Sequence, residues 1–184
     1  GTAVIARWLQ KYGYRVAVVP QPNWRDDLRD FRKLGAPRLY FGVNSGAMDS
    51  MVNHYTAAKR LRSDDAYTPE GKAGQRPDYA VTVYTKILKE IYPEVPVIIG
   101  GIEASLRRVT HYDYWQNSLK PSVLVESGAD WLCYGMGERT MLEFTKAIEA
   151  GRNVNDIRKI PQLGFYMDGR CRTKDAVILN SYER

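Results

Sequence analysis

The sequence predicts an α/β protein with a doubly wound, mainly parallel sheet. Short apolar runs alternate along the chain with amphipathic segments, which is the pattern of strands connected by helices. The run Val97–Ile99 is rich in β-branched residues, follows Pro96 and stops at Gly100–Gly101, as expected of a buried parallel strand that ends in a sharp turn. Apolar residues recur at helical spacing over 80–91, which is the clearest helix in the chain.

The amino-terminal half alternates in the same way. We expect a helix over 2–12, a strand over 14–19, a helix from Asn23 or Asp26 to Leu34, a strand over 38–43 and a helix over 50–60. Because a strand precedes the first helix of an α/β unit, we expect a strand upstream of Gly1. The polar segment 61–78 has no periodicity, and loops of that length are usually functional, disordered or covered by a partner.

The carboxyl-terminal half adds further elements. After the strand at 97–99 and the aromatic residues 111–115 we expect a helix running toward Glu126. A strand over 131–134, a helix over 139–150, and short strands over 163–167 and 176–179 follow. The turn Asp168–Gly169 between the last two predicts a hairpin or the lead-in to a next domain. We therefore expect an α/β domain over 1–160 and a short β segment over 161–184.

Composition narrows the class of protein. The chain has 184 residues and 44% hydrophobic residues, which is enough for one domain with a sizeable core. No apolar run approaches the ~20 residues of a membrane helix, and no secretory leader is visible, so we expect a cytoplasmic protein without a membrane partner. The two cysteines, Cys133 and Cys171, have no metal-site spacing and are interpreted as reduced thiols.

The formal net charge of +6 raises the question of a nucleic-acid partner. Basic residues gather in Lys59–Arg62 and Arg107–Arg108, but elsewhere they alternate with acidic residues and no recognition motif accompanies them. We interpret the charge as a solvated surface and rank nucleic-acid binding last among the hypotheses.

Three glycine-containing loops are the candidate functional site. Each follows an expected strand, and the carboxyl ends of parallel strands share one edge of a sheet, where ligands bind. The candidate cofactor-binding residues are Asn44, Ser45, Gly46, Gly100, Gly101, Glu103, Gly135, Gly137 and Glu138. Plain turns and helix caps fit the same loops. Gly135-x-Gly137 is half of a phosphate-binding pattern, but the third glycine is absent and Glu138 would repel phosphate, so a dinucleotide site has little support.

Aromatic and histidine side chains have mainly structural interpretations. The cluster His111–Trp115 could stack on a ring-bearing ligand, but a half-buried cap at the edge of the core is the favoured interpretation. His54 lies in a helix-like context, and we interpret both histidines as structural rather than as ligands. The sequence identifies no catalytic residue and no metal ligand.

Longer motifs resemble a known family. The segments 97–105 and 129–139 resemble the V-I-x-G-G-x-E-A and A-D-x-x-x-x-G-x-G-E pair of the cobalamin-binding-like domains attached to radical S-adenosylmethionine enzymes. The segments 41–50, 55–69 and 102–115 resemble the YgiQ family more closely. The resemblance covers most of the chain and implies a flavodoxin-like, Rossmann-type three-layer domain at the amino-terminal side of a radical core.

The resemblance implies that the radical core carries out the chemistry. This core is the expected partner of the present domain and lies downstream in the same chain. There a C-x-x-x-C-x-x-C triad holds a [4Fe–4S] cluster, and S-adenosylmethionine binds its open iron. Two cysteines cannot form the triad, so we expect no cofactor in this stretch. The D-x-H-x-x-G motif of cobalamin-binding domains matches neither histidine of this sequence. The sequence therefore leaves open whether the protein binds cobalamin. A corrinoid- or nucleotide-binding module without iron–sulfur chemistry is the alternative function.

Overall fold

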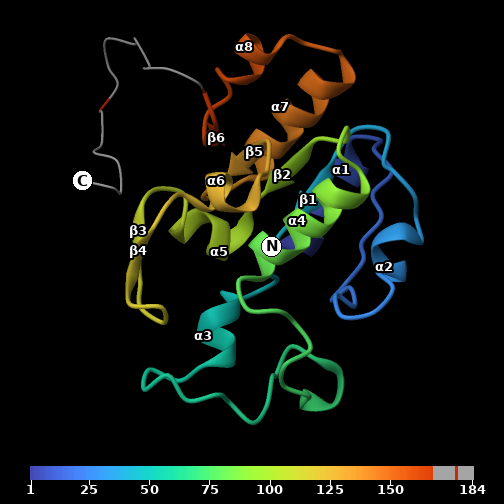
Figure 1. The fold of residues 1–184 in the computed structure, drawn as a ribbon. Coiled ribbons are helices and arrows are strands. Elements are labelled where there is room, and N and C mark those ends of the chain that lie inside the picture. Colours follow the sequence, from blue (N-terminus) through green and yellow to red (C-terminus); the bar gives the residue numbers. More distant parts are fainter. Residues whose placement is uncertain (168–176, 178–184) are drawn as a thin grey trace.

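A four-stranded sheet forms the centre of the computed structural model, which describes residues 1–167 and residue 177. Its strands are β1 (Phe41–Val43), β2 (Val97–Ile99), β5 (Trp131–Cys133) and β6 (Leu163–Phe165), in the spatial order β1-β2-β5-β6 (Figure 1). The first three strands are parallel, and β6 pairs antiparallel with β5. The predicted α/β class with a mainly parallel sheet is therefore confirmed, and the sheet is mixed.

Helices cover both faces of this sheet. On one face α2 (Arg29–Arg32), α4 (Ala80–Ile91) and α6 (Val123–Ser127) pack on the alternate strand residues Val97 and Ile99. On the other face α1 (Thr2–Lys11), α7 (Glu138–Glu149) and α8 (Val154–Ile157) pack around Ile98. All three residues of β2 are at most 2% exposed. This strand is buried on both faces, as its continuous apolar run predicted.

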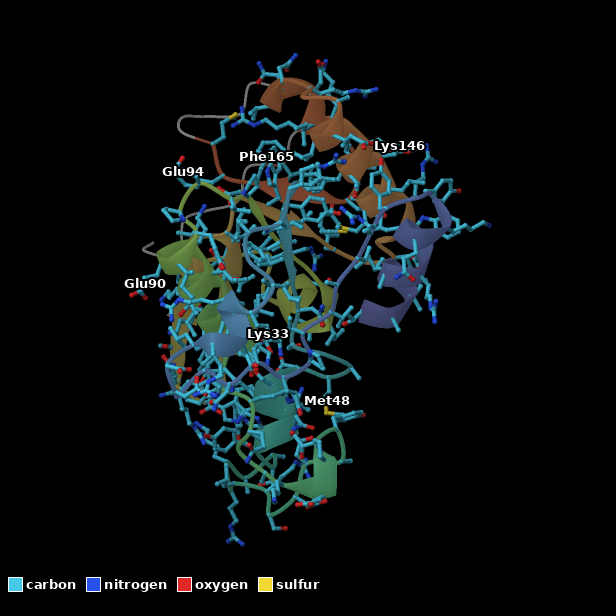
Figure 2. The ribbon with its side chains drawn as sticks, turned by 90° about the vertical axis from the view of Figure 1, so that its right-hand side faces the viewer. Lys33, Met48, Glu90, Glu94, Lys146 and Phe165 are labelled. Atoms are coloured by element: carbon cyan, nitrogen blue, oxygen red, sulfur yellow. The ribbon has the colours of Figure 1, made fainter. Side chains whose placement is uncertain are left out.

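The residues on the second face include an aromatic group. The Trp131 ring lies 5.7 Å from that of Phe144 and 6.0 Å from that of Phe165, both in edge-to-face geometry. Figure 2 shows Phe165 beside the sheet and Lys146 on the helix that packs over it. Because β6 contributes Phe165 to this core, it is held by packing as well as by its ladder to β5.

The elements with the strongest periodicity lie where the sequence predicts them. Helix α4 and strand β2 have the predicted bounds. Helix α1 and strand β5 each end one residue earlier than predicted, and α7 begins and ends one residue earlier. Strands β2 and β5 are buried on both faces and helices α4 and α7 bury one face, so tertiary packing and local pattern favour the same structure there. Helix α1 buries only Leu9.

The strand predicted over 14–19 is wrong. These residues have no regular secondary structure, and no strand of the described part pairs with them. Arg15 and Ala17 are exposed and Val18 is 51% exposed. The apolar content of the segment suggested a buried strand, but without a ladder partner the segment runs over the surface instead.

The helix predicted up to Leu34 is too long, because the structure has only the four-residue helix α2 there. The Asp26 and Asp27 side chains accept hydrogen bonds from the N–H groups of Leu28 and Arg29, at 2.9 and 3.1 Å, and Leu28 is left-handed with φ +58°. These short side chains stabilise turns in place of the first helical residues.

The helix predicted over 50–60 is also too long. Helix α3 covers Ser50–His54 only, and Tyr55 is extended and forms an isolated antiparallel bridge with Leu61. The turn between them contains Lys59 with φ +58°. The chain therefore reverses direction where the helix was expected to continue.

The segment 61–78 is packed in spite of its polarity. It contains the short helix η1 (Pro69–Gly71) and buries Asp65, Thr68 and Arg76 to 2%, 8% and 4% exposure. In Figure 1 it lies with α3 below the sheet, next to the loops that leave the strands.

The sequence did not predict a hairpin after α5 (Gly101–Leu106). Strands β3 (His111–Asp113) and β4 (Ser118–Lys120) form a separate two-stranded sheet, and they contain the first residues of the aromatic cluster. The Tyr114 hydroxyl donates to the carbonyl of Ala57 at 2.7 Å, so this cluster contacts the turn that follows α3.

The described residues do not test the expected hairpin of 163–167 with 176–179, which stays a prediction. Strand β6 pairs with β5, with Leu132 opposite Gly164. The turn Asp168–Gly169 and all of the second strand except Val177 lie outside the described residues.

Candidate functional site

Parallel pairing brings the three glycine loops to one edge of the sheet, which we call the carboxyl edge. The Gly100 N–H donates to the carbonyl of Val43 at 2.9 Å, which joins the second loop to the end of β1. The Gly135 N–H lies 3.3 Å from the hydroxyl oxygen of Ser105 on α5, which joins the third loop to the second. The predicted neighbourhood of the loops is present in the structure.

Two glycines at this edge are required by close approach. Gly101 has φ +82°, and a Cβ there would lie 3.2 Å from the Cβ of Asn44. A Cβ on Gly137 would lie 2.9 Å from the Sγ of Cys133. A larger residue at Gly101 would push the second loop away from the first, and a larger residue at Gly137 would clash with the Cys133 thiol at the end of β5.

Asn44 connects the carboxyl edge to the first helix. Its Oδ1 accepts hydrogen bonds from the Gly46 N–H at 2.9 Å and from the Thr2 hydroxyl at 3.0 Å. The amino-terminal end of α1 therefore lies beside the loop that follows β1.

Glu103 is buried and its carboxylate is fully engaged. The side chain is on α5 and is 1% exposed. Its Oε2 accepts from the N–H of Ser50 at 2.8 Å, and its Oε1 accepts from the N–H of Val81 at 2.9 Å. These are amide groups at the starts of α3 and α4, whose partial positive charge a carboxylate stabilises. Glu103 therefore connects α5 to the starts of α3 and α4.

A buried ion pair lies next to Glu103. Asp49 caps α3 by accepting from the N–H groups of Met51 and Val52, at 3.0 and 3.2 Å. The same carboxylate pairs with both terminal nitrogens of Arg107, the residue that follows α5. The Arg107 guanidinium also lies 5.8 Å from the ring centre of Tyr79. Burial of the Tyr79 hydroxyl and its hydrogen bond to Asp113 raise the pKa of Tyr79 far above its usual range.

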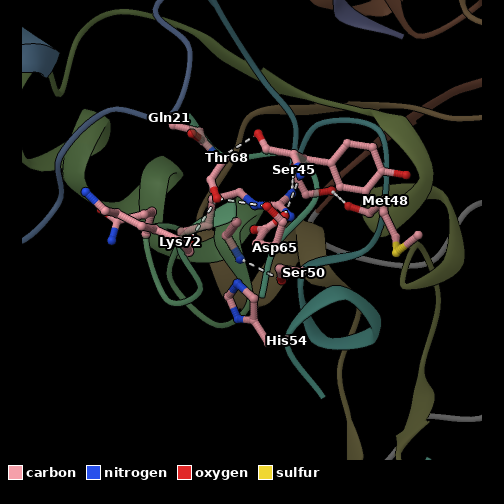
Figure 3. Close-up of polar contacts among 12 residues, drawn as sticks. Gln21, Ser45, Met48, Ser50, His54, Asp65, Thr68 and Lys72 are labelled. Carbon is pink, nitrogen blue, oxygen red and sulfur yellow. Dashed lines mark hydrogen bonds and ion pairs between the residues drawn. The ribbon is translucent and has the colours of Figure 1, made fainter. Parts of the chain in front are cut away.

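A second buried pair fixes the segment 61–78 against the first loop, as Figure 3 shows around Ser45 and Asp65. Arg76 donates to the carbonyl of Ser45 at 2.7 Å and pairs with Asp65 at 3.1 Å. Burial alone would raise the pKa of Asp65, but the Tyr67 N–H and the Arg76 guanidinium hold it below the ordinary value. The Ser45 hydroxyl donates to the Met48 carbonyl at 3.0 Å, so it is also engaged.

The third loop is the most open part of the carboxyl edge. Gly135 is exposed with φ +70°, and Met136 is 76% exposed. Glu138 begins α7 and is half-buried, and no side chain caps that helix. Beneath the loop, burial raises the pKa of the Cys133 thiol to about 11. Gly135 and Met136 are therefore accessible to another molecule.

Neither histidine lies among these loops. His54 is 6% exposed, and its Nδ1 is 2.7 Å from the Asp78 carboxylate, which also accepts from the Tyr55 hydroxyl at 2.7 Å. His111 lies in β3, with Nδ1 3.2 Å from the Val109 carbonyl. Within residues 1–167 and 177 no group of three histidine, cysteine or acidic residues is arranged to hold a metal ion.

Sequence reasoning missed the two ion pairs that hold the carboxyl edge together. Arg107 was interpreted as surface charge, and Asp65 and Arg76 belonged to a segment without periodicity. One signal could have indicated part of this arrangement, because Asp49 stands directly before a helix, where aspartate is a preferred cap. The partners of these residues are 11 and 58 positions away in the sequence, so no local pattern could indicate them.

The fold and the carboxyl edge define an α/β domain in which buried ion pairs fix the loops that follow the parallel strands. The family model described as Radical SAM N-terminal matches residues 1–184, and the chain belongs to that family. It is an N-terminal domain of a radical S-adenosylmethionine family protein, which confirms the resemblance found in the sequence.

Relatives agree with this assignment. A UPF0313 protein of Porphyromonas gingivalis strain W83 is 62% identical over 165 residues, which are 90% of this chain and 26% of the relative. A UPF0313 protein of Clostridium botulinum type A (strain ATCC 19397) is 47% identical over 183 residues, which are 100% of this chain and 28% of the relative. The chain thus spans about a quarter of the length of these relatives. No solved structure matches it.

Among the described residues, no helix is both long and apolar enough to cross a membrane.

Proposed function

We propose that this chain is the amino-terminal accessory domain of a radical S-adenosylmethionine iron–sulfur enzyme. The observation that carries the proposal is family membership over residues 1–184 together with relatives about four times as long. The expected partner is the radical core downstream in the same chain. A cytoplasmic location goes with this proposal, because iron–sulfur ligation needs reduced thiols.

The cofactors belong to that core. When bound, a [4Fe–4S] cluster with S-adenosylmethionine supplies a carbon radical by reductive cleavage. The residues of this chain do not fit the cluster, since it has two cysteines in all and Cys133 is buried with a raised pKa. No step of the reaction is therefore assigned to a residue of this chain.

We propose that the role of this chain is structural support at the carboxyl edge. The buried pairs of Asp49 with Arg107 and of Asp65 with Arg76 hold the first loop and α5 in one arrangement. We also propose the flavodoxin-like, cobalamin-binding-like three-layer fold and the division into 1–160 and 161–184. Helices on both faces of the sheet support the fold.

A second candidate is a nucleotide- or corrinoid-binding module at the same edge. The exposed, positive-φ backbone of Gly101 and Gly135 favours it, because such loops let a ligand approach closely. The described residues do not offer the usual histidine ligand for cobalt, since His54 is buried against Asp78 and His111 lies on the hairpin. Calorimetric titration of the 184-residue chain with cobalamin and with adenine nucleotides tests this candidate, and absence of heat at high concentration removes it.

The main proposal is tested by metal content. The full-length protein and the 184-residue chain are purified without oxygen and assayed for iron and acid-labile sulfide. The proposal expects about four irons per full-length chain and none in the shorter one. Absence of iron from the full-length protein would overturn it and favour the binding module.

A further inference from the structure

An open groove lies beside the edge strand β6. Its volume is about 390 Å³, and its floor contains Leu132 of β5 and Gly164 of β6. The walls come from α6 through Val125, from the segment after α5 through Val109, and from Tyr166. Tyr134, the first residue after β5, also lines the groove, so it continues into the third loop of the carboxyl edge.

The groove exists because of the side-chain alternation along β6. Leu163 and Phe165 belong to the core under α7, so only Gly164 faces the opposite side of the sheet. A Cβ at Gly164 would contact Leu132 at an ordinary 3.5 Å, so the absence of a side chain leaves space above the strand. Helix α6 covers the neighbouring strand but leaves β6 open on this face.

Apolar side chains surround this space and remain exposed. Val109 is 42% exposed, Val125 is 53% exposed and Tyr166 is 62% exposed. Single exposed apolar residues are ordinary, but several around one groove mark a surface that another element covers.

The described chain leads into the groove. Tyr166 lines it and Met167 follows directly, so the downstream chain starts at its rim. The match to the Porphyromonas relative covers 26% of that protein, so most of such a protein lies outside this stretch. A tether that starts at the groove gives the downstream part a high effective concentration there, which a separate copy does not have.

We propose that this groove is the docking surface for the downstream core of the same chain. The proposal rests on the proposed function, and it names the surface through which the accessory domain holds its partner. Docking there would place the core beside Tyr134 and the third loop, next to the carboxyl edge.

The test compares two valines in the full-length protein. Val125 on the groove wall and Val154 on α8 both lie in short helices and are matched in residue type and in exposure, at 53% and 51%. Each is replaced separately, as Val125→Cys and Val154→Cys, and the rate of alkylation by iodoacetamide is followed at that peptide by mass spectrometry. Docking predicts that position 125 reacts at least ~10-fold more slowly than position 154, because the partner covers only the first. Equal rates would overturn the proposal.

Two further readouts identify the occupant. Protection at position 125 that persists on dilution supports a partner in the same chain, whereas protection that disappears indicates a second copy and overturns the proposal. A benzophenone side chain at position 125 should cross-link to peptides beyond residue 184, with the same side chain at position 154 as control. Iron content is measured on the same samples. If the full-length protein contains iron but position 125 is not protected, the docking proposal fails and the proposed function stands. If the protein contains no iron, the proposed function fails.

Discussion

The guanidinium of Arg76 lies 3.1 Å from the carboxylate of Asp65, and both side chains are almost completely buried, at 4% and 1% exposure. The pair closes the polar segment 61–78 on itself, while a second nitrogen of Arg76 donates to the carbonyl of Ser45 at the carboxyl edge. A segment that has no periodic pattern is therefore fixed by one buried cation. The loop after β1 takes its position from the same contact.

Removal of that cation should destabilise the folded chain. In Arg76→Ala the Asp65 carboxylate stays buried without its partner, so the free energy of unfolding should fall by about 3–5 kcal/mol. Urea unfolding of the 184-residue chain measures the change. The control is Arg38→Ala, which breaks an exposed pair with Glu149 and should cost less than ~1 kcal/mol. Similar losses in the two variants would show that the buried pair contributes little.

The same pair predicts how stability depends on pH. The pKa of Asp65 is lower in the folded chain than in the unfolded chain, so the unfolded state binds more protons in acid. The resulting stabilisation is complete above the unfolded pKa of about 4 and is lost as pH falls through the folded pKa. Asp65→Asn should be less stable at neutral pH and lose less stability on acidification. Parallel curves of unfolding free energy against pH for the two proteins would contradict this assignment.

Glu103→Gln should be strongly destabilising although it changes few atoms. An amide keeps one acceptor oxygen and presents N–H groups to a backbone N–H, so either Ser50 or Val81 loses its buried acceptor. We expect a loss of about 2–3 kcal/mol, measured by urea unfolding. Glu90→Gln on the exposed side of α4 is the matched control and should change stability by less than ~0.5 kcal/mol. Equal effects would mean that the Glu103 carboxylate is not required by the fold.

Cys133 should be inert in the folded chain. Burial raises the pKa of its thiol to about 11, and the thiolate is the species that iodoacetamide attacks. At pH 8 the native chain should therefore alkylate at this peptide at least ~100-fold more slowly than the chain in urea, where the thiol returns to a pKa of about 8.5. Mass spectrometry of the peptide gives both rates. Fast labelling of the native chain would show that the thiol is accessible through the third loop.

The sequence was sufficient where local pattern and burial favoured the same structure. Val97–Ile99 is apolar on both faces, and 80–91 has one continuous apolar stripe, so both were located correctly. It failed at 14–19, where valines without a ladder partner suggested a strand. It also missed β3 and β4, because three-residue strands depend on pairing with each other rather than on a pattern of their own.

The candidate site followed the same rule. Topology alone brought the glycine loops to one edge, since the ends of parallel strands must meet there. The burial of Glu103 between two helix starts and the pairing of Asp49 with Arg107 depend on contacts distant in sequence. A charged residue in a polar loop gives no local sign of whether it will be buried and paired.

Methionine release from S-adenosylmethionine is the direct test of whether this chain is an accessory domain. The full-length protein and the 184-residue chain are purified without oxygen, reduced with dithionite and incubated with S-adenosylmethionine. If the chain is an accessory domain, the full-length protein releases methionine and the 184-residue chain releases none above the dithionite blank. Methionine release by the 184-residue chain, or no release by an iron-loaded full-length protein, would show that the chain is not such an accessory domain.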